Sequence, residues 1–234
     1  MTPLTIVCFR WFTPGYRSTF GPETVHVLKS MVTRHYPHPH RFVCISDDPT
    51  GLDGVETIPL WPDYANVPAP SGPRNPSCYR RLKLFDPAIE SLLGKRFVAM
   101  DLDCVVLGDL TPIFHRSEDF VIWGDTNPKT FYNGSLQLHT AGARAKVWTT
   151  FDPVKSPAAA KAAGHFGSDQ GWISFCLGQG EARWTTADGV YSYRNHIRST
   201  GVVPTDAKLI ICHGSFDPWC PQGRRTEWIA ENYR

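Results

Sequence analysis

The opening of the chain constrains the fold most, because two strand patterns flank one helix pattern there. Residues 4–9 form a short apolar run, partly β-branched, that predicts a buried strand. From Pro22 an apolar residue recurs every three or four positions, which predicts a helix that stops near Tyr36. Residues 41–46 predict the next strand. A strand, a helix and a strand in this order form a right-handed crossover and a parallel pair, which indicates an α/β fold.

A third strand pattern leads directly into two acidic residues. Residues 96–100 predict a buried strand, and an Asp-Leu-Asp tripeptide at 101–103 follows without a break. Before it, the Pro-rich segment 61–76 predicts a long loop, and 79–93 predicts one or two helical segments. The first half is therefore expected to contribute mainly parallel strands to the sheet.

The second half is predicted to hold shorter and more mixed elements. The predicted strands are 120–123, 135–138 and 209–212, and the predicted helices are 141–151 and 169–177. Residues 157–167, rich in Ala and then in Gly, are expected to form a mobile segment.

Length and composition limit the classes of protein. The 234 residues suit one domain, and the 41% hydrophobic content is enough for a core. A net charge of +2 does not resemble that of a dedicated nucleic-acid binder. No apolar run approaches the roughly 20 residues of a membrane span, and the start does not resemble a signal peptide. The seven cysteines, without a C-x-x-C pair, indicate free thiols and a cytoplasmic location.

The Asp-Leu-Asp tripeptide is the strongest candidate for a functional site. Alone it is a common pattern, and an aspartate that caps a turn after a strand would explain it equally well. Its place at the carboxyl end of a predicted strand favours a site, because open α/β sheets bind ligands there. Asp101 and Asp103 offer the hard oxygen ligands that Mg²⁺ or Mn²⁺ prefers.

Four stretches in order carry a family resemblance. They are residues 97–114 with the tripeptide, Tyr132-Asn-Gly-Ser-Leu136, Gly167-Ser-Asp-Gln170, and Cys212-His-Gly214 with Pro218-Trp219. Together they resemble nucleotide-sugar glycosyltransferases with the GT-A fold, and most closely the family 8-like enzymes of bacterial or phage type. The resemblance implies a single GT-A-like (Rossmann-like) domain over 1–234 with a mixed, mostly parallel central sheet. It divides into a nucleotide-binding half, 1–103, and an acceptor and sugar half, 104–234.

The resemblance also implies a reaction. A sugar would move from a nucleotide-sugar donor, a UDP-sugar in most relatives, to a hydroxyl acceptor with retention of stereochemistry. Asp101, Asp103 and His213 would hold Mn²⁺ or Mg²⁺, and Asp101 would also contact the donor. The metal would act as a Lewis acid on the departing diphosphate.

Further residues match positions around the donor. Gln170 and Asp169 match residues beside the anomeric carbon, and Asn133 matches a wall of the sugar pocket. Asp169 could instead cap the helix that follows it. Arg81 corresponds to a basic residue near the donor phosphates. Among the residues at the first loop, those available to stack on the nucleotide base are Phe9, Trp11 and Tyr16.

One position departs from the family pattern. Relatives commonly carry a Lys just before Pro-Trp that contacts the diphosphate, whereas this chain has Asp217 there. Another cation would have to replace it, and the candidates are Arg194, Arg198 and Arg224.

Two other classes of function compete with glycosyl transfer. A nucleotidyltransferase shares this layout, but it usually carries a Gly-rich basic loop after the first strand, where the stretch Cys8-Phe-Arg-Trp11 of this chain has one cation. A non-catalytic nucleotide-sugar-binding module would not need the predicted metal ligands. The acceptor is left open as a glycan, a small molecule or a modified DNA base, and the sequence does not indicate an oligomeric state.

Overall fold

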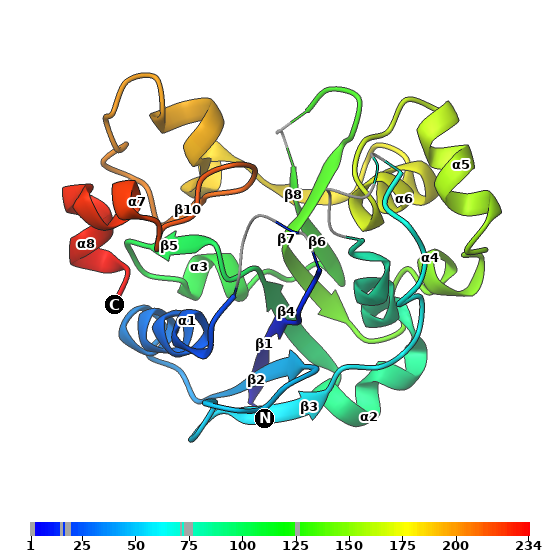
Figure 1. Ribbon diagram of the computed structural model, residues 1–234, viewed down its shortest axis with the longest axis horizontal. Coiled ribbons are helices and arrows are strands. Elements are labelled where there is room, and N and C mark those ends of the chain that lie inside the picture. Colours follow the sequence, from blue (N-terminus) through cyan, green and yellow to red (C-terminus); the bar gives the residue numbers. More distant parts are fainter. Residues whose placement is uncertain (1–2, 15, 17–19, 71, 73–76, 125–126) are drawn as a thin grey trace.

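The computed structural model describes residues 3–14, 16, 20–70, 72, 77–124 and 127–234. Within them, a central sheet has seven strands in the order β3-β2-β1-β4-β7-β6-β8 (Figure 1). The strands are β1 (Leu4–Arg10), β2 (His40–Ser46), β3 (Glu56–Pro59), β4 (Arg96–Met100), β6 (Phe120–Gly124), β7 (Tyr132–Thr140) and β8 (Ala182–Trp184).

The sheet is mixed and mostly parallel, as predicted. β1 pairs in parallel with β2 and β4, β2 with β3, and β6 with β8. β7 alone runs against its neighbours β4 and β6. Because β7 is reversed, its first residues lie at the sheet edge where the parallel strands end.

The strand order reverses between β1 and β4. The chain builds β1, β2 and β3 outward in one direction and then returns to place β4 on the other side of β1. Ligands bind at such a switch point in open α/β sheets, outside the carboxyl ends of the strands. The ends concerned here are Arg10 of β1 and Met100 of β4.

A small second sheet lies beside the first. β5 (Cys104–Val106) pairs antiparallel with β10 (Leu209–Ile211), which pairs in parallel with β9 (Val190–Ser192). The ladder extends by one bond, in which the Cys212 amide donates to the Asp103 carbonyl at 2.7 Å. The backbone at 212–213 is therefore fixed next to the acidic tripeptide.

Helices cover both faces of the central sheet (Figure 1). The long helix α1 (Pro22–His35) begins with a proline in its first turn, as predicted, and ends before Tyr36. The other helical elements are η1 (Tyr79–Phe85), η2 (Pro87–Ile89), α2 (Glu90–Leu93), α3 (Thr111–Phe114), α4 (Lys146–Thr149), α5 (Lys155–Ala162), α6 (Asp169–Leu177), η3 (Thr186–Asp188), η4 (Tyr193–Ile197), α7 (Pro221–Arg225) and α8 (Glu227–Asn232).

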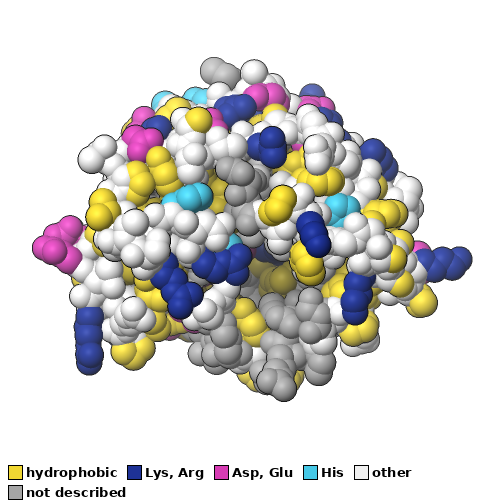
Figure 2. Space-filling model, turned by 90° about the horizontal axis from the view of Figure 1, so that it is seen from above, with side chains coloured by type: hydrophobic (Ala, Val, Ile, Leu, Met, Phe, Trp, Pro, Cys, Tyr) yellow, Lys and Arg dark blue, Asp and Glu magenta, His cyan; other side chains and the backbone are white. Residues whose placement is uncertain are grey.

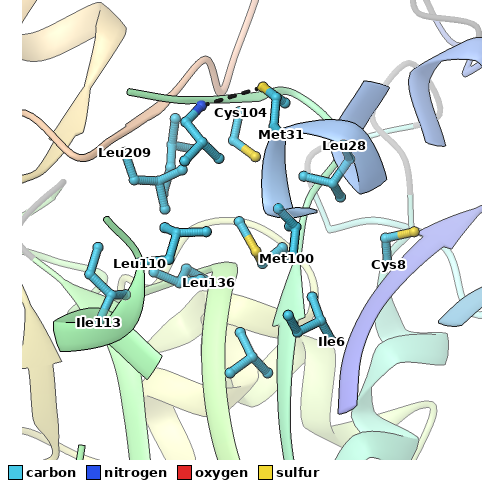
Figure 3. Close-up of a cluster of buried hydrophobic side chains, with 14 of the residues drawn as sticks. Ile6, Cys8, Leu28, Met31, Met100, Cys104, Leu110, Ile113, Leu136 and Leu209 are labelled. Atoms are coloured by element: carbon cyan, nitrogen blue, oxygen red, sulfur yellow. Dashed lines mark hydrogen bonds between the residues drawn. The ribbon is translucent and has the colours of Figure 1, made fainter. Parts of the chain in front are cut away.

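Two apolar cores lie on opposite faces of the sheet. In β1, Ile6 and Cys8 join the core beneath α1 and the small sheet, whereas Val7 and Phe9 join the core beneath η1 and α6. Figure 3 shows part of the first core, where Met31 of α1 packs among residues of β4, β5 and β10. A strand covered on both faces must be apolar throughout, which explains the unbroken run that predicted β1.

Three sequence predictions need correction. The predicted helix 141–151 is reduced to the four residues of α4. The segment expected to be mobile, 157–167, instead includes most of α5, because its alanines favour a helix. The predicted strand 135–138 is extended to the nine residues of β7.

Within the described residues, no helix has the length and apolar character needed to cross a membrane. The assignment of nucleotide and sugar to the two halves of the chain stays a prediction.

Candidate active site

A pocket opens at the switch point between β1 and β4, with a volume of about 80 Å³. Six residues predicted to contact the nucleotide, the phosphates or the metal line it, whereas His213, Asn133, Asp169 and Gln170 are not among its described lining residues. The described lining residues are Phe9, Trp11, Thr13, Tyr16, Phe20, Cys78, Arg81, Asp101, Leu102 and Asp103. A second hollow of about 390 Å³ adjoins it and shares Trp11, Thr13 and Phe20. The sequence did not single out Thr13, Phe20 or Cys78.

Aromatic side chains form one wall of the pocket. Phe9 is buried and packs edge-on against Trp11 at 6.0 Å and Trp61 at 5.7 Å between ring centroids. Phe20 packs edge-on against Trp219 at 5.4 Å. Phe9 is thus part of the core as well as the pocket, whereas Trp11 and Tyr16 are half-buried and present ring surface to it.

Two of the lining residues, Arg81 and Asp101, belong to a cluster of three charged side chains. Arg81 donates through Nε to Asp169 Oδ2 at 2.8 Å and through Nη2 to the same oxygen at 2.7 Å. Its Nη1 donates to Asp101 Oδ1. We call this set the Arg81 cluster. It joins η1, the end of β4 and the start of α6, which lie far apart in the sequence.

Gly134 makes room for the Arg81 cluster. A Cβ atom at this position of β7 would lie 2.6 Å from Arg81 Nη2 and 3.1 Å from Asp169 Oδ2. Next to it, the Asp101 amide donates to the Ser135 carbonyl at 2.9 Å, which continues the pairing of β4 with β7. The guanidinium therefore lies against the bare backbone of β7.

The start of α6 is held from the pocket side. Ser168, not Asp169, is the N-cap residue of α6, so the capping role considered for Asp169 is wrong. The Ser168 hydroxyl instead accepts from the Cys78 amide at 2.9 Å. Asp169 is the first helical residue, and its carboxylate accepts hydrogen bonds from Arg81.

Burial controls the ionisation of the Arg81 cluster. Desolvation raises the pKa of Asp169 above its ordinary value, and the positive charge of Arg81 offsets part of that rise. Burial lowers the pKa of Arg81, but the charges of Asp101 and Asp169 outweigh it and hold that pKa well above its ordinary value. The guanidinium is therefore a permanent charge within the site.

His213 lies on the other side of the acidic tripeptide. Its Nε2 atom is 2.8 Å from Ser192 Oγ, and its ring packs edge-on against Trp123 at 5.2 Å. Burial lowers the pKa of His213 to about 4, and the nearby charge of Arg194 adds to the effect. The ring is therefore neutral at pH 7, the form in which imidazole binds metals.

The predicted metal ligands fit a divalent cation in type but are not gathered into one group. The carboxylates of Asp101 and Asp103 and a neutral His213 are suitable donors. The backbone bond from Cys212 to Asp103 extends the pairing of β10 with β5, so residue 213 follows directly after the backbone partner of residue 103. Among the residues that the structure describes, however, no three His, Cys, Asp or Glu side chains converge into a metal-binding group. In this conformation Asp101 is bound to Arg81 instead.

The two residues predicted on the sugar side flank the Arg81 cluster. Asn133 is buried in β7, and its Oδ1 accepts from the Ser135 amide at 2.9 Å. Gln170 follows Asp169 in α6, and its Nε2 lies 3.5 Å from the Phe166 carbonyl. Each is the chain neighbour of a residue in contact with Arg81, namely Gly134 and Asp169.

The cations proposed to replace the missing Lys differ in position. Arg194 is exposed, and its Nη1 lies 3.3 Å from where a Cβ would stand on Gly214, beside His213. Arg224 donates to the Trp219 carbonyl at 2.9 Å and lines a different hollow. Arg198 is exposed, and its amide bonds to the Tyr193 carbonyl. Arg194 therefore lies beside the His213–Gly214 turn, close enough for its charge to act on His213.

Charge is unevenly distributed on the face above the strand ends. Figure 2 shows a hollow near the centre of this face, with Lys and Arg side chains around it and most Asp and Glu farther out. A hollow with a basic surround suits an anionic ligand.

Comparisons with known proteins define the fold. No protein-family model matches the chain. No curated protein matches it either. Solved structures do match: a galactosyltransferase, LgtC, in complex with donor and acceptor sugar analogues gives a TM-score of 0.61 at 15% identity. That match covers 97% of this chain and 94% of the other.

Two further structures agree. An active-site mutant of LgtC, in which a glutamine is replaced by glutamate, gives a TM-score of 0.61 at 14% identity, with coverage of 97% and 94%. The glycosyltransferase GlyE of Streptococcus pneumoniae TIGR4 gives 0.64 at 12% identity and covers 99% of this chain. The match spans 60% of the GlyE chain. These likenesses confirm the predicted GT-A-like fold.

Proposed function

We propose that this protein is a metal-dependent glycosyltransferase that moves a sugar from a nucleotide-sugar donor, a UDP-sugar, to a hydroxyl acceptor with retention. One observation carries the proposal. Residues chosen for the donor side from scattered sequence motifs line a single pocket at the switch point of the sheet. Three segments that lie far apart in the sequence, 9–16, 81 and 101–103, contribute these residues to it.

The charges around the pocket favour a divalent cation. When ionised, Asp101, Asp103 and Asp169 carry three negative charges against the single positive charge of Arg81. A donor diphosphate is also negative and would be repelled. A divalent metal at Asp101, Asp103 and His213 would supply the missing positive charge and stabilise the departing diphosphate.

Each wall of the pocket has a proposed partner. The exposed faces of Trp11 and Tyr16, with the edge of Phe9, are suited to stack on the nucleotide base. Arg81 holds Asp101 and Asp169 in place in this structure. For Arg81 to contact the donor phosphates as predicted, it would have to release Asp101 or Asp169.

The sugar side is proposed to lie at the start of α6. LgtC has a glutamine in its active site, since its mutant is described as an active-site change. Gln170 is the corresponding candidate here, with Asn133 near the sugar hydroxyls. An amide is not a strong base, so Gln170 would stabilise the oxocarbenium-like centre by its dipole. Asp169 would keep the start of the helix oriented through Arg81.

The nucleotidyltransferase alternative has less support. Arg10, the cation at the end of β1, is bonded to the backbone carbonyls of Phe20 and Asp48. It is thus occupied rather than available to a triphosphate. A non-catalytic binding module stays possible only if no donor is turned over, which the following experiment measures.

The test is donor binding and hydrolysis across a panel of nucleotide sugars, with Mn²⁺, with Mg²⁺ and with a chelator. We expect one UDP-sugar to be hydrolysed only with metal. Asp103→Asn should lower Mn²⁺-dependent donor affinity by at least about 10-fold, since it removes a charged ligand. The matched control is Asp53→Asn, at an exposed loop position away from the pocket, which should behave as the wild type.

Two results would count against the proposal. Equal hydrolysis with chelator and with Mn²⁺ would show that the reaction does not need a metal. The release of pyrophosphate from a nucleoside triphosphate would indicate nucleotidyl transfer. The product also tests retention: an α-linked donor should give an α-linked product.

A further inference from the structure

The end of the last helix contributes a tyrosine whose hydroxyl is buried inside the fold. Tyr233 is the C-cap residue of α8, and its amide donates to the Ile229 carbonyl at 2.7 Å. Its side chain lines a hollow of about 440 Å³ between α1 and the C-terminal helices. The hydroxyl itself is buried, and within the described part of the chain it has no hydrogen-bond partner. Such a group is costly to bury, so a further role for it is indicated.

The backbone around Tyr233 is fixed from two sides. Arg34 of α1 donates to the Asn232 carbonyl at 2.6 Å and to the Arg234 carbonyl. The Tyr233 ring also packs against Trp219, at 6.2 Å between ring centroids, and α8 lies against β5. The position of the hydroxyl is therefore set by the fold and not by a mobile chain end.

The buried hydroxyl lies near the acidic tripeptide. β5 begins at Cys104, directly after Asp103. Burial raises the pKa of the Tyr233 phenol, and the rise is increased by the neighbours Cys104, Asp103, Cys212 and Glu23. Electrostatic contributions of this kind fall off with distance, so the phenol lies beside the junction of β5 and β10. It keeps its proton there and can donate a hydrogen bond.

Asp103 is the best acceptor among these neighbours. Burial also raises the pKa of Cys104 and of Cys212, so both stay thiols, which accept only weakly. Glu23 is an exposed residue and makes the smallest of the four contributions. Asp103 Oδ1 is buried, and a carboxylate oxygen accepts more strongly than a neutral group.

We propose that Tyr233 is a positioning residue for the metal site: its hydroxyl donates to one oxygen of the Asp103 carboxylate when the other oxygen binds the divalent cation. The inference rests on the proposed function. Among the described residues no metal-binding group is assembled in this conformation, so Asp101, Asp103 or His213 must move before they share an ion. A donor fixed beside Asp103 would orient its carboxylate for that step, as partners of metal ligands commonly do.

The test compares the full wild-type chain with Tyr233→Phe. Each is titrated with Mn²⁺ in the presence of UDP, and the EPR signal of free Mn²⁺ gives the Kd of the metal. We expect Tyr233→Phe to raise this Kd about 10-fold, the lower end for loss of a partner of a metal ligand. Its urea midpoint without metal should not fall, because the ring is kept and the hydroxyl has no partner among the described residues.

Tyr36→Phe is the matched control. Tyr36 is buried, and its hydroxyl is hydrogen-bonded to His115 Nε2 at 2.9 Å. Its ring packs on His40, the first residue of β2, so it lies at the edge of the sheet opposite to the tripeptide. Tyr36→Phe should lower the urea midpoint, because it removes a formed hydrogen bond, and should leave the Kd of Mn²⁺ unchanged. Glu23→Gln, which removes the charge of the other neighbouring carboxylate, should also leave that Kd unchanged.

Three results would overturn the inference while the wild type binds Mn²⁺. They are an unchanged Kd of Mn²⁺ in Tyr233→Phe, an equal rise of that Kd in Glu23→Gln, and a urea midpoint that falls in Tyr233→Phe as it does in Tyr36→Phe. The last would show that the hydroxyl has a structural bond instead. If the wild type binds Mn²⁺ no better than Asp103→Asn does, the proposed metal site itself fails, and the role of Tyr233 fails with it.

Discussion

Arg81 and Arg144 each bind two carboxylates, and their surroundings differ. Arg144 donates to Glu181 Oε1 at 2.8 Å and to Asp119 Oδ2 at 2.9 Å. The Arg144 side chain is 28% exposed and that of Asp119 57%, whereas those of Arg81 and Asp169 are 9% and 4% exposed. The same chemical arrangement is thus near water at Arg144 and inside the protein at Arg81.

The difference separates a structural contact from a candidate site. The Arg144 set ties the loops around β6 and β8 together, and an exposed set of this kind contributes little to stability. The charges of the Arg81 cluster have lost their hydration, and only their mutual attraction compensates for that loss. Removal of one partner therefore leaves a buried charge without compensation. Charges kept in such a place are expected to serve the ligand, and the Arg81 cluster lies at the donor pocket.

The largest expected effect comes from removing each arginine in turn. Arg81→Met should lower the free energy of unfolding by about 3–5 kcal/mol, because it strands Asp169 and Asp101 without a partner. Arg144→Met should lower it by less than about 1 kcal/mol. Urea unfolding at pH 7 measures both. Equal losses of unfolding free energy in the two variants would show that burial does not make the Arg81 cluster different from the Arg144 set.

A smaller effect is expected when the Arg81 cluster is displaced but left complete. Gly134→Ala places a Cβ 2.6 Å from Arg81 Nη2, so the guanidinium must shift. We expect a loss of about 1–2 kcal/mol in unfolding free energy and a weaker donor affinity. Gly108→Ala is the control, since its nearest contact would be an ordinary 3.5 Å. Both are measured by urea unfolding and by donor titration, and a Gly134→Ala protein with wild-type values in each would show that the fit is loose.

The smallest expected effect is a pH dependence that only one variant shows. In Arg81→Met the stranded Asp169 has a raised pKa, since burial already raises it and the offsetting guanidinium is gone. A carboxyl with a pKa raised in the folded state loses stability as pH rises above its unfolded pKa. The penalty of Arg81→Met should therefore shrink on acidification from pH 7 towards pH 4, by up to about 1 kcal/mol over the whole range.

Arg144→Met should show no such relief over that range. Hydrogen bonds from Arg144 hold the pKa of Asp119 below its ordinary value in the wild type, and the carboxyl is exposed once Arg144 is removed. Unfolding curves at pH 7, 5.5 and 4 would measure the two trends. Parallel trends would show that Asp169 is better solvated than its burial indicates.

The sequence predicted elements that rest on local patterns. The opening crossover, the end of β4 at the acidic tripeptide and the bounds of α6 all follow from runs of apolar residues. The short strands β3, β5, β8 and β9 were missed, since three or four residues carry too little periodicity. The glycines at 164 and 167 indicate a mobile segment, whereas the alanines before them favour the helix α5.

The internal partners of the site were beyond local patterns. Arg81 lies 20 positions from Asp101 and 88 positions from Asp169, and no spacing rule connects them. Arg81 was predicted to contact phosphates, and its double pairing could not be foreseen without the fold. Gly134 lies in one of the four stretches that carry the family resemblance. The need for glycine there comes from the Arg81 guanidinium packed against β7, which is visible only once η1, β7 and α6 are in place.

The reversed strand β7 has a consequence for synthesis on the ribosome. Strands β1 to β4 emerge first, and one edge of β4 then stays unpaired until β7 arrives at Tyr132. Asp169 follows Asp101 by 68 residues, roughly 3 to 14 seconds at usual translation rates. During that interval Arg81 has one of its two carboxylate partners, and the open edge of β4 can pair with other nascent chains. A ribosome stalled between β4 and β7 would therefore hold a chain prone to aggregation rather than a half-formed enzyme.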